Sequence, residues 1–166
     1  MAPGDPTRHL GLDLGATNLK WAVLERDDES WTRLDHGQLP TAAAEGAGAV
    51  LGRMAGTAAE ARSRWPGIES VGLGVPGLYD AEAGITTFLP NLPPDWADLP
   101  VAEPLAERIG LPVRLINDAR AFGLALDWAR AEGLQLEHAP NLVPRDGDFM
   151  VGSDRQTDLL LERPLQ

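Results

Sequence analysis

Short apolar runs broken by glycine open the chain. Residues 8–13 and 19–24 form two such runs of similar length, with Gly15 between them. Residues 31–39 form a third, more polar extended segment that ends at Pro40. Runs of this length between turn residues are typical of strands. The pattern therefore predicts a meander of three strands at the start of the chain.

A helical spacing follows the meander. Apolar residues recur three or four positions apart at Val50, Met54, Ala58, Ala61 and Trp65. This spacing, which stops at Pro66-Gly67, predicts a helix with one packed face. We expect Thr41 to cap its start. The glycines in its first half each lower helix stability by about 1 kcal/mol relative to alanine; they are Gly46, Gly48, Gly52 and Gly56.

Strands and helices alternate in the rest of the predicted domain. We expect a strand over residues 70–75, an extended piece over 84–89, a helix over 99–109, a buried strand over 113–117 and a last helix opened by Asp118. The predicted class is α/β, with a mixed sheet and the order β-β-β-α-β-α-β-α. Periodicity is lost after Gly133. We therefore predict one domain over residues 1–133, followed by a loosely ordered, divergent tail over 134–166.

Composition and charge disfavour several kinds of binding partner and site. The 166 residues carry a net charge of −11 with no cluster of Lys and Arg, which disfavours nucleic acid and anionic membrane surfaces as partners. No stretch approaches the ~20 apolar residues of a membrane helix, so we expect a cytoplasmic protein. Cysteine is absent and the three histidines are scattered, so no zinc site is expected.

The first candidate site is the segment GLDLGATNLK, residues 11–20. A carboxylate at a strand end, followed by a glycine turn with a threonine and then a lysine, presents backbone N–H groups and a hydroxyl to a phosphate. Asp13 could hold Mg²⁺ there through water. The alternative is a plain hairpin turn in which Gly15 permits an unusual backbone and Thr17 and Asn18 make local hydrogen bonds.

Three further segments suit a small polar ligand. In VGLGVPGLYD, residues 71–80, small residues at a strand end allow close approach of a ligand, or simply end a strand in a proline turn. In LINDARA, residues 115–121, Asn117 and Asp118 lie at the carboxyl edge of a buried strand, where ligands bind in open α/β sheets. Asp118 could accept a proton from an attacking hydroxyl, or only cap a helix.

The last candidate is the proline-rich loop LPNLPPDW, residues 89–96. Asn91 could bind sugar hydroxyls and Trp96 could stack on a sugar ring, or Trp96 could pack inward.

These four segments, in this order, resemble the ROK sugar kinases, the bacterial glucokinase group among them. The resemblance covers most of residues 8–125 and implies a ribonuclease-H-like domain of the actin-like ATPase type. It assigns phosphate binding to the first segment, at Asp13, Gly15, Thr17, Asn18 and Lys20. It assigns sugar binding to Gly77, Asn91 and Asn117, and makes Asp118 both a sugar ligand and the catalytic base.

The resemblance implies an ATP-dependent hexose kinase. In that family the base activates a sugar hydroxyl, usually the 6-OH, to attack the γ-phosphate of magnesium ATP, and catalysis rests on positioning and charge neutralisation. The implied partners are a sugar and a nucleotide. The identity of the sugar, ATP or polyphosphate as donor, and a homodimer are all left open.

The sequence departs from the family pattern at several points. Pro94-Asp95 precedes Trp96 where many members have a single glycine, and Leu126 stands where a glutamate is expected. Beyond Leu126 we expect the resemblance to end, because the family's second phosphate loop and its second, zinc-containing domain have no counterpart in the sequence. Ligands in half a cleft are exposed to water, so we expect a truncated or frame-disrupted kinase that is inactive alone.

Two alternatives remain open at the level of sequence. One is a non-catalytic sugar-binding or regulatory module, since the family includes repressors with a DNA-binding winged helix. The first predicted strand begins within ten residues of the start and leaves no room for such a helix. The other is a folded remnant without function.

Overall fold

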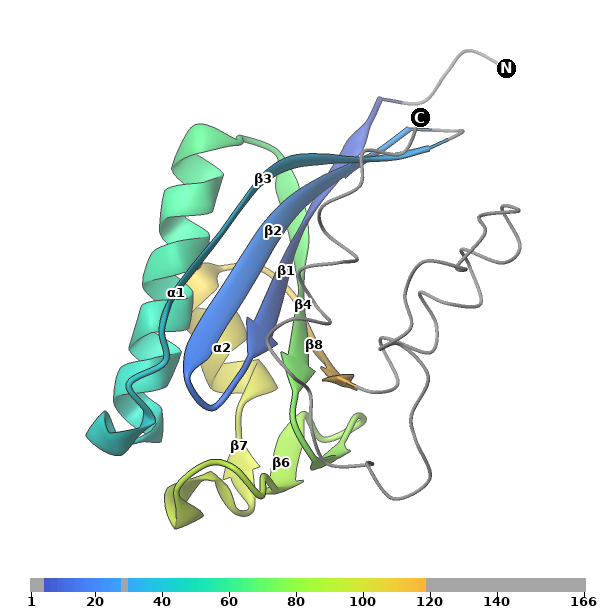
Figure 1. Ribbon diagram of the computed structural model, residues 1–166. Helices are drawn as coiled ribbons and strands as arrows, with labels where there is room; N and C mark the ends of the chain where they lie inside the picture. The colour runs from blue at the N-terminus through green and yellow to red at the C-terminus, as the bar shows by residue number, and fades with distance from the viewer. Residues whose placement is uncertain (1–4, 28–29, 119–166) are drawn as a thin grey trace, which may run out of the picture.

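Two sheets and two α-helices make up the part of the chain that this computed structural model describes, residues 5–27 and 30–118 (Figure 1). The main sheet contains β1 (Thr7–Leu14), β2 (Asn18–Arg26), β3 (Trp31–Pro40), β4 (Ile68–Val75) and β8 (Val113–Asn117). The smaller sheet contains β5 (Leu78–Asp80), β6 (Ile85–Phe88) and β7 (Leu99–Pro100). The helices are α1 (Ala47–Arg64) and α2 (Ala102–Ile109), with 3₁₀ turns η1 (Ala43–Glu45) and η2 (Pro94–Trp96).

The main sheet has the strand order β3-β2-β1-β4-β8. The first three strands form the predicted antiparallel meander, while β4 runs parallel to β1 and β8 runs parallel to β4. This mixed sheet is that of the ribonuclease-H-like fold, as the resemblance implied. Because β1, β4 and β8 are parallel, their carboxyl ends share one edge of the sheet.

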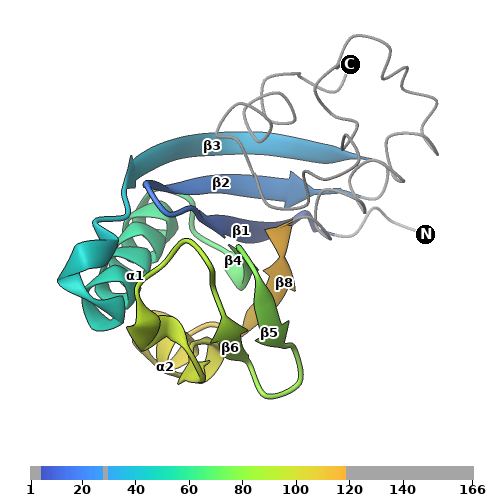
Figure 2. The same cartoon turned by 60° about the horizontal axis from the view of Figure 1, so that its bottom comes forward.

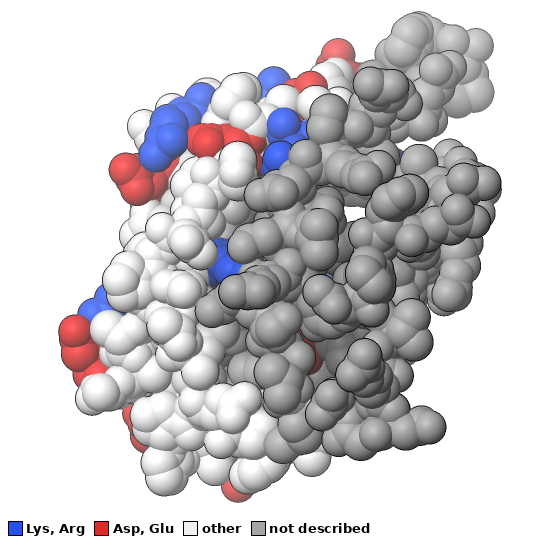
Figure 3. All heavy atoms as spheres, viewed as in Figure 1, with Lys and Arg blue, Asp and Glu red and all other residues white. Residues whose placement is uncertain are grey.

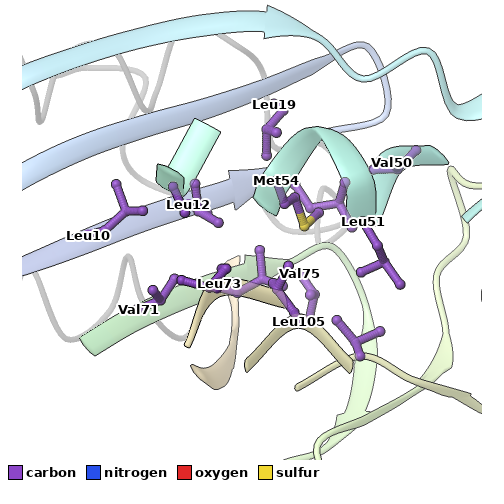
Figure 4. Close-up of a cluster of buried hydrophobic side chains, with 14 of the residues drawn as sticks. Leu10, Leu12, Leu19, Val50, Leu51, Met54, Val71, Leu73, Val75 and Leu105 are labelled. Carbon is purple, nitrogen blue, oxygen red and sulfur yellow. The ribbon is translucent and has the colours of Figure 1, made fainter. Parts of the chain in front are cut away.

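The hydrophobic core lies between one face of the main sheet and the two helices, which cover the same side of it (Figures 1 and 2). Alternate residues of each strand face this layer, as the period of two demands. Side chains from the sheet and from α1 and α2 point toward one another there (Figure 4). The fully buried members include Leu10, Leu14, Leu19, Val50, Met54, Leu73, Val75 and Leu105. Neither helix is long and apolar enough to cross a membrane.

The predicted order of elements lacked the smaller sheet. Between β4 and α2 the structure has β5, β6 and β7, of which only β6 was predicted, as the extended piece over 84–89. The helix α2 begins at Ala102 rather than residue 99, because Leu99 and Pro100 pair with β6. The predicted helix beyond Asp118, the domain end at residue 133 and the tail over 134–166 lie outside the described residues.

The predicted cap of the long helix was wrong. Thr41 is fully buried and its hydroxyl donates to the carbonyl of Gly15, at 2.7 Å, so it does not cap a helix. The helix α1 begins later, at Ala47, after a 3₁₀ turn and Gly46 with φ +89°. Gly46 therefore precedes α1 and only Gly48, Gly52 and Gly56 lie inside it. Its buried face is the predicted one, with Val50, Met54, Ala58 and Ala61 all in the core.

Candidate functional site

The carboxyl edge of the main sheet brings together segments that are far apart in sequence. Asp13 on β1 is paired with Gly74 on β4, and Gly74 is paired with Ile116 on β8. Asn117 ends β8 and Asp118 follows it directly. With about 4.8 Å between neighbouring strands, the ends of β1 and β8 lie roughly 10 Å apart. The predicted phosphate turn and the predicted base therefore lie along one edge, on either side of β4.

The turn after β1 is a tight hairpin turn. Both interpretations of the sequence, a phosphate-binding turn and a plain hairpin, required such a turn. Gly15 donates its N–H to the carbonyl of Asn18, at 3.0 Å, and closes the hairpin. A Cβ on Gly15 would come within 2.7 Å of that carbonyl oxygen, so a larger residue is excluded. Ala16 and Thr17 at the tip are exposed. These two residues therefore present exposed surface at the sheet edge.

Asp13 and Lys20 lie side by side at the start of this turn. They are cross-strand partners in the β1–β2 ladder, on the face opposite the helices, because Leu12 and Leu14 face the core. Lys20 is buried, with 5% of its surface exposed. Gly74 lies on the other side of Asp13, and a Cβ there would be 3.2 Å from Asp13 Oδ1. Lys20 was predicted to lie in the phosphate motif and in the second strand, but its pairing with Asp13 was not foreseen.

Gly77 connects the Asn-Asp segment to the proline-rich loop. Its carbonyl accepts a hydrogen bond from Nδ2 of Asn117, at 2.9 Å. Its φ is +143°, and a Cβ would lie 2.3 Å from the carbonyl oxygen of Phe88 and 3.0 Å from Cδ of Pro90. Since Asn91 follows Pro90 and is exposed, the three predicted sugar-binding positions belong to one connected region.

The loop that carries Asn91 is anchored at both ends. Leu89 is buried, and Trp96 is fully buried in the core cluster. The hydroxyl of Thr86 donates to the Trp96 carbonyl, at 2.8 Å. Of the two roles considered for Trp96, inward packing is the one the structure shows, because a side chain without exposed surface cannot stack on a sugar ring.

Two residues hold these loops through contacts that were not predicted. Thr41 holds the phosphate turn by two hydrogen bonds. Its N–H donates to the Thr17 carbonyl, at 2.8 Å, and its hydroxyl donates to the Gly15 carbonyl. Asp95 accepts a hydrogen bond from the N–H of Ala47, at 2.7 Å, through Oδ2. Both had a visible signal: Thr41 follows the third strand directly, and Asp95 occupies a departure from the family pattern.

Metal ligands are sparse in the described residues. Across residues 5–27 and 30–118, no group of three or more His, Cys, Asp or Glu side chains could hold a metal ion. One carboxylate beside a turn of backbone N–H groups, as at Asp13, nevertheless suits Mg²⁺ that arrives with a nucleotide, because Mg²⁺ in such sites keeps most of its ligands from water and phosphate. The residues present therefore fit magnesium carried by a nucleotide and offer no all-protein cage.

Charged side chains on the face of Figure 3 show no concentrated basic patch in the part of the chain that the structure describes. Acidic and basic side chains are interspersed along the rim in that view. Several charged side chains of the described residues are paired, as in the ion pair between Arg64 and Asp35, at 3.0 Å. The described part of this face lacks the cluster of positive charge that is typical of a nucleic-acid surface.

Known proteins resemble this chain in sequence. The profile described as ROK family matches residues 9–136, which is beyond Leu126, where we expected the resemblance to end. A glucokinase from Thermotoga maritima is 36% identical over 121 residues, covering 72% of this chain and 36% of the glucokinase. A xylose repressor from Caldicellulosiruptor bescii is 36% identical over 62 residues, covering 37% of this chain and 15% of the repressor.

A solved structure gives the same result. The chain superimposes on the ROK hexokinase from Thermus thermophilus with a TM-score of 0.59 and 37% sequence identity, over 72% of this chain and 38% of the hexokinase. The chain thus spans well under half the length of these relatives. Because the family profile covers most of the sequence and the fold agrees, this chain belongs to the ROK family.

Proposed function

We propose that the chain supplies the phosphate turn, the base and a sugar-binding loop of an ATP-dependent hexose kinase. The observation that carries the proposal is the shared sheet edge, at which the Gly15 turn and the Asn117-Asp118 pair lie on either side of β4. A glucokinase and a hexokinase among the relatives support a hexose such as glucose as the substrate.

Each candidate residue has a role in this mechanism. Backbone N–H groups of the turn at Gly15, with the hydroxyl of Thr17, would bind phosphate oxygens. Asn18 shapes the turn, since its carbonyl accepts the Gly15 N–H. Lys20, beside Asp13, would add positive charge near the phosphates. Asp13 is the side chain that would hold magnesium, which, when bound, neutralises charge on the phosphates.

The sugar would lie on the other side of β4. Asn91 is exposed and would bind a sugar hydroxyl, while Gly77 allows the loop to lie close to Asn117. Asn117 and Asp118 would bind neighbouring hydroxyls. Asp118 would accept the proton of the attacking sugar hydroxyl while the hydroxyl oxygen forms a bond to the γ-phosphorus of ATP. The bond from that phosphorus to the bridging oxygen would break at the same time, and ADP would leave.

Calorimetric titration of the 166-residue chain with glucose and with magnesium ATP tests this proposal. We expect heat with both ligands. Thr17→Val should weaken ATP binding and leave the glucose affinity unchanged. Asn91→Ala should weaken glucose binding and leave the ATP affinity unchanged. Each loss should be about 2- to 10-fold, because one hydrogen bond is lost. Thr32→Val, an exposed change on β3, is the matched control for Thr17→Val and should alter neither affinity.

A regulatory sugar-binding module is the second candidate, because a xylose repressor is among the relatives. Such a module needs the sugar loop but no phosphate turn. Heat with xylose or glucose and none with magnesium ATP would favour it over the kinase. The absence of heat with every ligand would contradict both.

A further inference from the structure

Both loops of the candidate site are attached to the same end of α1. We propose that Asp95 is a positioning residue that couples the sugar loop, residues 89–96, to the phosphate turn, residues 15–17, through the first turns of α1. The inference rests on the proposed function for its ligands, and on hydrogen bonds within the chain for its geometry.

The sugar loop is attached through a helix cap from a distant part of the chain. The first N–H groups of a helix lack partners within the helix and carry partial positive charge. Gly46, the residue before α1, has no side chain with which to satisfy them. Asp95, 48 positions after Ala47, supplies the missing acceptor by binding the N–H of Ala47, at 2.7 Å. A carboxylate at this point also interacts favourably with the helix dipole.

Gly46 lies beside this contact. A Cβ on Gly46 would lie 3.4 Å from Oδ2 of Asp95, an ordinary van der Waals distance. Gly46 also has φ +89°, which turns the chain into α1. Asp95 lies in η2, directly before buried Trp96 and four residues after Asn91. The helix cap therefore fixes the loop that presents Asn91.

The phosphate turn is attached to the same helix through Thr41. Thr41 is fully buried and holds the turn by two hydrogen bonds, to the carbonyls of Gly15 and Thr17, at 2.7 and 2.8 Å. The carbonyl of Thr41 in turn accepts a hydrogen bond from Arg53, at 3.1 Å. Arg53 lies in the second turn of α1 and also binds the carboxylate of Glu45, in the 3₁₀ turn between Thr41 and the helix.

A continuous path of hydrogen bonds follows from these contacts. It runs from the phosphate turn through Thr41 and Arg53 to α1, and from the helix end through Asp95 to the sugar loop. Phosphoryl transfer depends on the relative placement of its two substrates, so a common support for both loops matters for function. Loss of the Asp95 cap should therefore disturb the phosphate turn, which Asp95 does not contact.

The test uses the 166-residue chain and compares Asp95→Ala with Asp95→Asn. Asparagine caps a helix as well as aspartate does, whereas alanine has no acceptor. We expect Asp95→Ala to weaken magnesium ATP binding by about 3- to 10-fold, the equivalent of a lost helix cap, and Asp95→Asn to keep the wild-type affinity. Asp98→Asn changes an exposed carboxylate two residues beyond the sugar loop; it is the control and should change neither affinity.

Coupling between two sites is reciprocal, so a change that loosens the phosphate turn should also weaken sugar binding. Thr41→Val keeps the buried shape and removes the hydroxyl. We expect it to weaken glucose binding by about 2- to 5-fold, with recovery in Thr41→Ser, since one neutral hydrogen bond is lost. If Asp95→Ala leaves the ATP affinity unchanged, or if Thr41→Val leaves the glucose affinity unchanged, Asp95 is only a local anchor and the proposal is wrong.

Amide hydrogen exchange of the ligand-free chain separates this inference from the proposed function. We expect Asp95→Ala to speed exchange at Ala47 and also at Gly15 and Thr41, whereas Asp95→Asn should not. Faster exchange confined to Ala47 would overturn the coupling. A wild-type chain that binds neither glucose nor ATP would refute the proposed function, while the exchange data would still decide whether Asp95 couples the loops.

Discussion

At the scale of single residues, the backbone of Gly77 determines how the candidate sugar-binding positions meet. Its carbonyl is the acceptor for Asn117, and its missing side chain lets the segment before Asn91 lie against it. Gly77 was assigned to the sugar site through the resemblance to the ROK sugar kinases. The sequence could not show the reason, because Phe88 and Pro90 reach Gly77 only through the fold of the smaller sheet.

Gly77→Ala should therefore destabilise the protein. A Cβ at 2.3 Å from the Phe88 carbonyl forces the backbone to move, and alanine at φ +143° is strained in addition. We expect a loss of about 2–4 kcal/mol in the free energy of unfolding, measured by urea titration.

Gly72→Ala is the control for this change. It lies on β4, and a Cβ there meets nothing within 4 Å. Alanine restricts the unfolded chain more than glycine does, so we expect Gly72→Ala to be neutral or to stabilise by up to about 1 kcal/mol. Equal losses in the two variants would show that the close approach at Gly77 has no energetic effect.

At the scale of elements, the buried face of α1 was predictable and its start was not. Apolar residues at intervals of three and four define the face, and tertiary packing buries them as the pattern indicates. The start depends on Asp95, which lies 48 positions away and cannot be found from local capping rules. The same rules assigned Thr41 to the helix, whereas the fold uses its hydroxyl for the Gly15 turn.

The glycines inside α1 should be replaceable with a gain in stability. A Cβ on Gly48, Gly52 or Gly56 meets nothing within 4 Å, and all three positions are exposed. Each change to alanine should stabilise by about 0.5–1 kcal/mol, because glycine loses more backbone entropy in a helix. The increase should appear as a higher urea midpoint with an unchanged slope.

Gly46→Ala is the matched comparison at the end of the same helix. Its φ of +89° strains any residue with a side chain, so we expect a loss of about 1 kcal/mol or more. A gain at Gly46, or losses at the three internal positions, would contradict the boundary of α1 described here.

At the scale of the whole molecule, the two sheets differ in how extensively their strands are paired and packed. The strands β1 and β4 have neighbours on both sides and a face packed against α1 and α2. The smaller sheet has three short strands and exposes Leu78 and Phe88, at 65% and 56% of their surface. Stability is therefore unevenly distributed over the described residues.

Native-state hydrogen exchange should reveal this difference. We expect amides in the centres of β1 and β4 to exchange roughly a hundredfold more slowly than those in β5 and β6, because the short strands can open without disrupting the main core. Equal protection in the two sheets would instead show that they open only together.

Sequence alone determined the class of fold, the meander, the buried face of α1 and the family. These depend on periodicity and on short motifs, which reflect local geometry and the burial of apolar residues. It also located the Gly15 turn and the Asn117-Asp118 pair, because both lie at the carboxyl ends of predicted strands.

Only the tertiary structure decided how these parts are joined. The pairing of β1 with β4 and β8 brings the two segments to one edge, Trp96 turns into the core, and Asp95 and Thr41 bind partners far along the chain. The physical reason is that a buried or unpaired polar group takes whichever partner the fold brings near. Local sequence shows that Thr41 and Asp95 can form hydrogen bonds, and the packing of distant segments selects with which atoms they do so.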